Sequence, residues 1–165
     1  MSPNYFEGTK QDPYHISIGA VVRDSEGKIC CHYFSHASHP AFGSFENLYL
    51  LMRETIEPNE SIEQCLHRGL QEEFGMKAEL ISHLGSIVSH FPKGDVVVEK
   101  TTLYFLCEYI SHDRANRKVD DPEASSVITW LTPSELILIM RDQGKRFGRE
   151  DLDESIVIER LIGLA

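Results

Sequence analysis

Between residues 54 and 76 the chain reads ETIEPNESIEQCLHRGLQEEFGM, and this segment carries the clearest structural signal in the sequence. Its apolar residues recur at the spacing of a helix face. Ser61 can cap the first turn, Gln64 is placed to return the hydrogen bond, and Gly75 is suited to end the helix. The pattern predicts a helix from Ser61 to Phe74 that ends in a glycine turn.

Two adjacent carboxylates, Glu72 and Glu73, lie near the end of this predicted helix. Each helical residue advances about 100° around the axis, so the two flank the line through Gly69, with Arg68 further round. Carboxylates this close repel each other unless a cation lies between them, and oxygen-rich sites suit Mg²⁺ or Mn²⁺. Two interpretations are open: a pair that binds a metal ion, or a solvated helix face.

The segment resembles the Nudix box of the Nudix hydrolases in the order and spacing of its charged, aliphatic and glycine positions. The matching residues are Glu60, Arg68, Leu70, Glu72, Glu73, Gly75 and Met76. The run IEPNES at 56–61 is similar to the IEPGES that commonly opens the helix in this family, and the similarity extends over roughly residues 15–140. The resemblance implies an α/β fold, a Nudix-like α/β/α sandwich with a mixed β-sheet.

The resemblance also implies a role for each matching charged residue. Glu72 and Glu73 would bind Mg²⁺ or Mn²⁺ and act in catalysis. Arg68 would brace these carboxylates, and Glu60 would support the loop before the helix. In several branches of the family a carboxylate from the loop before the tryptophan-containing strand completes the metal site or serves as base, and Glu123 is the first candidate here.

Other residues are weaker candidates for the site. Asp121 in the same loop and Glu99 in a predicted strand could serve in place of Glu123, although this loop could equally be a solvated acidic one. Lys100 could bind substrate phosphates. The pair Lys100-Thr101, together with Asp120-Asp121, is faintly similar to branches that hydrolyse dinucleoside polyphosphates or diphosphoinositols.

Two positions depart from the family pattern. Arg53-Glu54 stands where the family has a Gly-Gly turn with a metal-binding carbonyl, and a residue with a side chain resists positive φ. The Glu54 carboxylate could substitute for that ligand. The first glutamate of the family's Arg-Glu pair is Gly69 here, and a mid-helix glycine costs on the order of 1 kcal/mol relative to alanine. Either activity has been lost and the position has drifted, or Gly69 makes room for something bulky.

We therefore consider two functions. The first is a metal-dependent hydrolase that cleaves a pyrophosphate bond in a nucleoside diphosphate linked to another moiety, with dinucleoside polyphosphates as one option. Weak activity is compatible with these departures. The alternative is a catalytically inactive Nudix-fold module that binds or senses a nucleotide. An active site should bring Glu123, Asp121 or Glu99 close to Glu72 and Glu73. The family often forms dimers, so a homodimer is a further expectation.

Composition narrows the class of protein. The 165 residues are 41% hydrophobic, enough for one ordinary domain, and we assign 1–14 to a polar N-terminal segment and 15–165 to a single Nudix-like domain. A net charge of −10 disfavours coating of polymeric nucleic acid and favours a small nucleotide-like substrate with a local cation. No apolar run suits a bilayer and the N-terminus does not resemble a secretory signal, so we expect a cytoplasmic protein without membrane partners.

The cysteines and histidines suggest no separate site. Cys30, Cys31, Cys65 and Cys107 contain no C-x-x-C pair, which favours free, buried thiols in a reducing compartment. His32, His36 and His39 lie near two of these cysteines, but their spacing matches no paired zinc motif. We therefore predict scattered surface histidines.

Periodicity places the other elements. The expected strands are 15–23, 28–34, 47–52, 80–91, 96–110 and 127–131, the expected helices are 133–143 and 153–164, and the expected loops are 35–45 and 111–125. The first two strands are predicted to form a hairpin, and the two long strands to pair antiparallel. This order of elements predicts a mixed sheet with helices on its faces.

Overall fold

A computed structural model describes residues 4, 6–39, 43–120 and 124–163, with side chains described except at 37–39 and 43. Its strands are β1 (Tyr14–Arg23), β2 (Ile29–His39), β3 (Gly43–Leu50), β4 (Met52–Thr55), β5 (Met76–Lys93), β6 (Val96–His112) and β7 (Val127–Leu131). Its α-helices are α1 (Ile62–Phe74), α2 (Pro133–Phe147) and α3 (Ser155–Gly163), and short 3₁₀ turns span Arg114–Asn116 and Glu150–Leu152.

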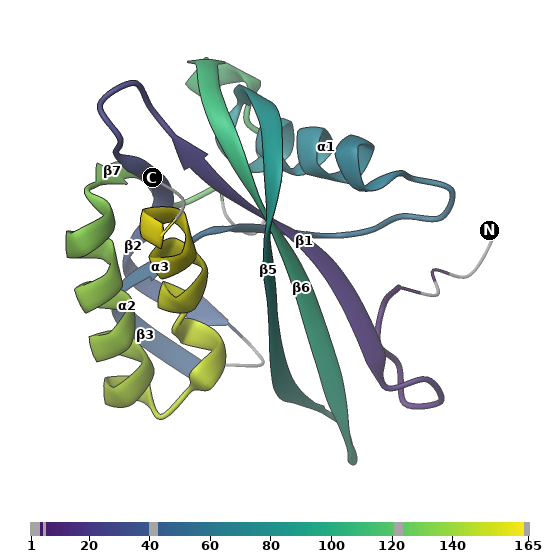
Figure 1. Cartoon of the computed structure of the whole chain (residues 1–165). Coiled ribbons are helices and arrows are strands. Elements are labelled where there is room, and N and C mark those ends of the chain that lie inside the picture. Colours follow the sequence, from purple (N-terminus) through teal and green to yellow (C-terminus); the bar gives the residue numbers. More distant parts are fainter. Residues whose placement is uncertain (1–3, 5, 40–42, 121–123, 164–165) are drawn as a thin grey trace.

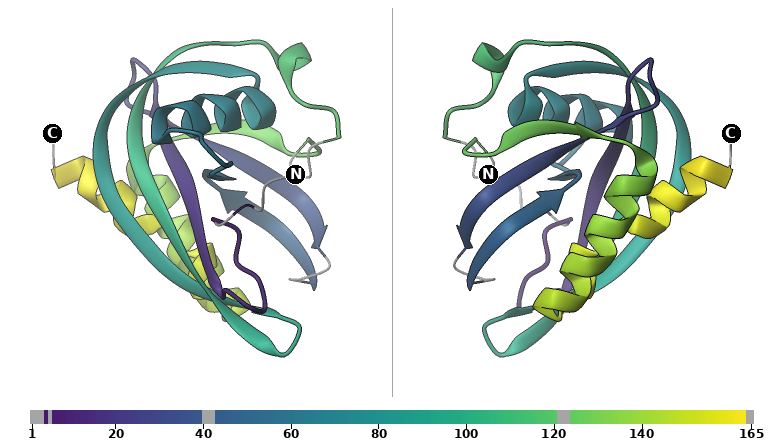
Figure 2. Two further views of the ribbon diagram at one scale, coloured as in Figure 1. Left: turned by 90° about the vertical axis from the view of Figure 1, so that its right-hand side faces the viewer. Right: turned by 90° about the vertical axis from the view of Figure 1, so that its left-hand side faces the viewer.

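The seven strands form one mixed sheet between two helix layers (Figures 1 and 2). Along the sheet the order is β3-β2-β1-β6-β5, with β4 added on β1 and β7 on β2. β1 runs parallel to β6 and antiparallel to β4. This is the α/β/α arrangement with a mixed sheet expected from the sequence.

Side chains of alternating strand residues divide the core between the two faces of the sheet. Ala20 and Val22 of β1 belong to the cluster that packs under α1, together with Leu66 and Phe74 of that helix. Val21, between them, belongs to the cluster that packs against α2 and α3. β1 is therefore buried on both faces, which fixes its neighbours β4 and β6 rigidly beside it.

The helix predicted from Ser61 to Phe74 is confirmed as α1, including both ends. Ser61 accepts from the Gln64 N–H and the Gln64 side chain accepts from the Ser61 N–H, which completes a capping box. Gly75 adopts φ 61° and its N–H bonds back to the last turn. The Gly75 cap fixes the end of α1 that carries Glu72 and Glu73.

Three sequence-based expectations about the elements were wrong in extent. The 35–45 region, predicted as a loop, is strand up to His39 and again from Gly43. The predicted hairpin of the first two strands pairs only at Arg23↔Ile29, because β4 takes the place of β2 along β1. α2 continues past the glycine at 144, where the structure brings Asp153 close, and ends at a left-handed Gly148.

In the part of the chain that the structure describes, no helix is long and apolar enough to cross a membrane.

The four cysteines are buried and unpaired, and burial raises the pKa of the Cys31, Cys65 and Cys107 thiols to about 12. Their predicted burial is confirmed.

Candidate active site

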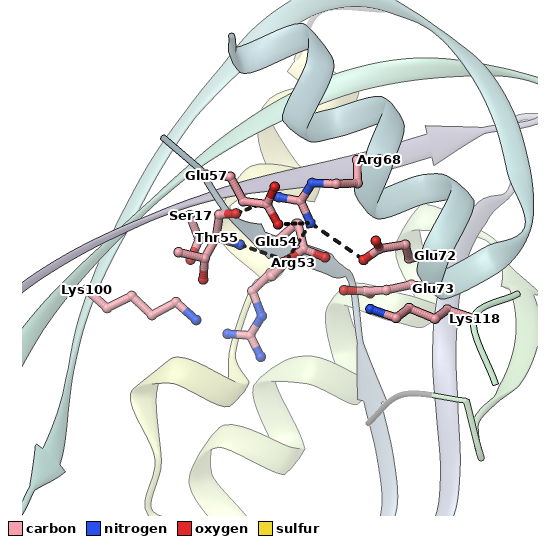
Figure 3. A pocket seen from close by; sticks show the side chains of 10 residues that line it. All are labelled: Ser17, Arg53, Glu54, Thr55, Glu57, Arg68, Glu72, Glu73, Lys100 and Lys118. Carbon is pink, nitrogen blue, oxygen red and sulfur yellow. Dashed lines mark hydrogen bonds and ion pairs between the residues drawn. The ribbon is translucent and has the colours of Figure 1, made fainter. Parts of the chain in front are cut away.

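A cavity of about 370 Å³ lies where α1, β4, β1 and β6 meet (Figure 3). Its lining side chains are Ser17, Arg53, Glu54, Thr55, Glu57, Arg68, Glu72, Glu73, Lys100 and Lys118. Four carboxylates and four cations line this polar cavity. Both carboxylates of the predicted pair line it, and so does the lysine predicted to bind phosphates.

Arg68 lies among the carboxylates that line the cavity. Its Nε and Nη2 donate to the two Glu60 oxygens at 2.7 and 3.0 Å, and Nη2 also donates to the Thr55 carbonyl at 2.8 Å. Its Nη1 lies 3.3 Å from Glu54 Oε1 and 3.5 Å from Glu72 Oε2. The hydrogen bonds from Arg68 lower the pKa of the Glu60 carboxyl, so this carboxylate stays charged and fixes the loop before α1.

Glu73 is held by a buried histidine of β2. The Glu73 side chain is only 3% exposed, and its Oε2 lies 2.7 Å from His32 Nε2. The other ring nitrogen of His32 lies 2.6 Å from Ser126 Oγ. The prediction of a surface position for His32 was wrong, since its side chain is 1% exposed. Because Cys30 packs toward α1, strand alternation alone indicates that His32 faces α1 as well.

Gly69 lies where α1 crosses β4. A Cβ atom on Gly69 would lie 2.9 Å from Glu54 Cβ and 2.8 Å from Met52 Sδ, closer than real Cβ contacts come. The departure from the family pattern at Gly69 therefore coincides with the departure at Glu54, because the two residues are packed against each other.

Three cations line the rest of the cavity. Arg53 comes from β4 and lies with Nε 3.7 Å from Oε2 of the buried Glu154. Lys100 comes from β6, and burial together with the positive charge of Arg53 lowers its pKa to about 8. The Lys118 N–H donates to the Glu72 carbonyl at 2.9 Å, which ties the segment carrying Lys118 to the end of α1. Lys100 and Lys118 extend inward from opposite sides (Figure 3).

Arg53 and Lys118 were not among the residues that sequence reasoning proposed for the site. Arg53 entered the sequence argument only as a departure from the family's glycine turn. Lys118 carries no local pattern, since its place depends on how the segment after β6 returns to α1. Both are brought to the cavity by tertiary contacts rather than by a motif.

Of the other predicted carboxylates, the structure describes only Glu99. Glu123 and Asp121 lie outside the described residues. Glu99 is 48% exposed, lies 3.9 Å from His90 and is not among the lining residues. Among the described residues, Glu54 and Glu57 line the cavity as well, and Glu54 lies near the same nitrogen of Arg68 as Glu72 does.

The donor set suits a hard divalent cation. Among the described residues no three His, Cys, Asp or Glu side chains are already gathered around one point. Mg²⁺ does not need such a cage, because it keeps several waters and binds through one or two carboxylates plus substrate phosphates. Glu54 Oε1 and Glu72 Oε2 lie 3.3 and 3.5 Å from Nη1 of Arg68, so carboxylate oxygens from β4 and α1 come close to each other beside the cavity. These residues therefore fit Mg²⁺ or Mn²⁺.

Comparison with known proteins bears on the fold. A family model described as NUDIX domain matches residues 13–151. A solved NUDIX hydrolase from Nitrosomonas europaea is similar, with 17% identity and a TM-score of 0.62 over 98% of this chain and 90% of that chain. A MutT protein from Methanosarcina mazei Go1 has 18% identity and a TM-score of 0.57 over 87% of this chain and 99% of that chain. The E. coli ORF135 protein has 17% identity and a TM-score of 0.54 over 92% of this chain and 90% of that chain. No curated protein matches. At these identities the likeness confirms the predicted mixed α/β fold.

Proposed function

The chain belongs to the NUDIX domain family, and from this membership we propose that it is a metal-dependent hydrolase acting on a pyrophosphate bond. The proposed substrate is a nucleoside diphosphate linked to another moiety, with dinucleoside polyphosphates as one option. The observation that carries the proposal is the cavity itself, in which a wall of carboxylates faces a group of cations. Such a site can hold a divalent cation and a diphosphate together.

The residues divide into two tasks. Glu54 and Glu72 would hold Mg²⁺ or Mn²⁺, with Glu73 beside them. When bound, this ion supplies positive charge at the phosphate and lowers the pKa of a bound water. Lys100, Lys118 and Arg53 would bind the phosphate oxygens, because charge-assisted hydrogen bonds to phosphate are strong and directional.

Glu73 is our proposed general base among the described residues. Its carboxylate lines the cavity, while the bond to His32 fixes its orientation and a proton taken from water can be shared with that histidine. Glu123 stays our proposed additional metal ligand and base from the loop before β7. Arg68 and Glu60 are proposed to support the site by positioning the carboxylates.

A catalytically inactive nucleotide-binding or sensor module is the second candidate, and one observation favours it. Carboxylates of the cavity already have partners within the protein: Glu54 and Glu72 lie beside Arg68, and Glu73 lies beside His32. With these partners in place, the cavity could bind a nucleotide through Lys100 without any metal ion. The two candidates differ in turnover and in metal dependence.

A substrate panel tests the proposal. Purified protein is incubated with nucleoside diphosphate derivatives and dinucleoside polyphosphates, with Mg²⁺, with Mn²⁺ and with EDTA. Glu72→Gln is the test variant, and Glu63→Gln on the exposed side of α1 is the matched control. We expect metal-dependent product release that is lost in Glu72→Gln and kept in Glu63→Gln. Ligand binding without turnover on any substrate would favour the binding module instead.

A further inference from the structure

The two unusual positions of the chain, Glu54 and Gly69, are distant in sequence and adjacent in space. Glu54 lies on β4, antiparallel to β1 and opposite Ile18, and Gly69 lies on the face of α1 that packs onto β4. The Cβ of any side chain on residue 69 would lie 2.9 Å from Glu54 Cβ and 2.8 Å from Met52 Sδ, so two residues of β4 pack against this point. The glutamate on the strand therefore occupies the space that a residue on the helix would otherwise fill.

We infer that Glu54 is a ligand of the divalent cation, and that Gly69 is required because it admits the Glu54 side chain. The inference rests on the proposed function and adds a ligand to its site. It also gives a functional reason for the mid-helix glycine, which is unfavourable to α1 and which the packing of Met52 on the same point favours as well.

The geometry around Glu54 supports a fixed ligand rather than a mobile surface acid. Its side chain is 19% exposed, and its Oε1 accepts from the Thr55 N–H at 3.2 Å. Its carbonyl lies 3.7 Å from Cys65 Sγ, which ties β4 to α1 at this point. Strand pairing and these contacts hold the carboxylate before any ligand arrives, as a metal site requires.

The direction of the carboxylate supports the same role. Glu54 Oε1 and Glu72 Oε2 lie 3.3 and 3.5 Å from one nitrogen, Nη1 of Arg68. Two oxygens from different elements, one from β4 and one from the last turns of α1, therefore approach a common positive charge. A divalent cation beside this point would receive one oxygen from each element, and substrate phosphates and waters would complete its shell.

The test measures Mn²⁺ binding to the whole protein by electron paramagnetic resonance, in which free Mn²⁺ gives a strong signal that falls on binding. Replacing Glu54 with Gln keeps the size of the side chain and removes its charge. We expect Glu54→Gln to weaken Mn²⁺ binding by about tenfold or more, because even indirect partners of metal ligands cost about that much. Glu63→Gln is expected to bind as the wild type does.

The exchange variant Glu54→Gly/Gly69→Glu moves the carboxylate from strand to helix. We expect it to bind Mn²⁺ more tightly than either single change, a non-additive result that independent sites do not give. Thermal unfolding checks that each variant folds. If Gly69→Glu alone does not fold, the Mn²⁺ affinity of Glu54→Gln decides the question. If Glu54→Gln binds Mn²⁺ as the wild type does while Glu72→Gln loses Mn²⁺ binding, this inference is overturned and the proposed function still stands. Absence of Mn²⁺ binding in the wild type, alone and with substrate, would overturn both.

Discussion

Arg68 lies among more negative charge than one guanidinium neutralises. Glu60 is bound bidentately, and Glu54, Glu57 and Glu72 lie within 3.3 to 3.7 Å of Nη1. The surplus negative charge is what an added cation would relieve. The same residue therefore stabilises the loop before α1 and leaves the site attractive to a metal ion.

Removal of Arg68 should destabilise the protein. We expect Arg68→Met to lower the free energy of unfolding by about 2 kcal/mol, because the poorly exposed Glu60 carboxylate would lose both hydrogen bonds and its counter-charge. Urea unfolding at neutral pH measures the change. Lys10→Met, which removes an exposed ion pair with Asp95, is the control and should cost less than about 1 kcal/mol. Equal losses in both variants would mean that the Arg68 cluster is no stronger than a surface pair.

His15 should make the fold sensitive to acid. Its Nδ1 accepts from the Gly8 N–H and its Nε2 lies 3.0 Å from Thr55 Oγ1, so the neutral ring fits the site. Burial, with the charges of Lys100 and Lys93, lowers its pKa to about 4 from 6.5. The unfolded chain therefore takes up this proton first as the pH falls, and stability present above about pH 6.5 is lost progressively toward about pH 4.

The comparison variant for this effect is His15→Gln. Between about pH 7 and about pH 4 the wild type should lose on the order of 1–2 kcal/mol more unfolding free energy than His15→Gln does. Denaturant unfolding at several pH values gives both curves. Parallel curves would show that the pKa of His15 is the same in the folded and the unfolded protein and would contradict the argument.

Lys100 should give ligand binding its own pH dependence. With a pKa lowered to about 8, its ammonium is charged below that pH and neutral above it. The affinity for a nucleoside diphosphate such as ADP, measured by calorimetry, should fall as the pH rises through 8. Lys100→Arg should remove this fall because arginine stays charged, and Lys100→Met should bind about tenfold more weakly at every lower pH. If the affinity of Lys100→Arg for ADP falls with pH in the same way, the pH dependence belongs to another group.

At the scale of single elements, the end of α1 is the most constrained point near the site. Gly75 has φ 61°, and a Cβ there would lie 2.2 Å from the Asp113 carbonyl oxygen. We expect Gly75→Ala to lower the unfolding free energy by about 2 kcal/mol or more, from backbone strain plus this clash. It should also weaken nucleotide binding, because the displaced segment carries Lys118.

Gly27 offers a matched control for Gly75. It too has positive φ, 81°, but nothing lies within 4 Å of its added Cβ. Gly27→Ala should therefore show the strain alone, about 1 kcal/mol, and should leave nucleotide binding unchanged. Thermal unfolding and calorimetry on both variants separate strain from clash. Similar effects at the two positions would refute the contact with Asp113.

The elements that were predicted well are those whose signals are local. α1 was predicted with both caps because Ser61, Gln64 and Gly75 act within their own turns. The β2–β3 ends were missed because exposed residues such as His36 and Glu46, which are paired across the two strands, give no apolar alternation. Gly144 was wrongly predicted to end α2. The structure explains the glycine by the close approach of Asp153, and this tertiary contact leaves no local signal in the sequence.

At the scale of the whole molecule, sheet topology builds the cavity. β1 lies between the parallel β6 and the antiparallel β4, so Ser17 is paired with Thr102 on one side and Thr55 on the other. This register brings residues of β4 and β6 to one place beneath the end of α1. The carboxylates of α1 were predictable from their motif. Their proximity to Arg53 and Lys100 was not predictable, because it depends on strand pairing across long sequence separations.

The most direct test of the account is to locate the metal ion. Crystals of the protein grown with Mn²⁺ and a non-hydrolysable nucleoside diphosphate analogue would be measured at a wavelength where manganese scatters anomalously. The account predicts an anomalous peak in the cavity about 2.1 Å from carboxylate oxygens of Glu54 and Glu72, with phosphate oxygens in the same shell and Lys100 beside the phosphates. A bound analogue without a manganese peak, or a peak that touches neither glutamate, would contradict it.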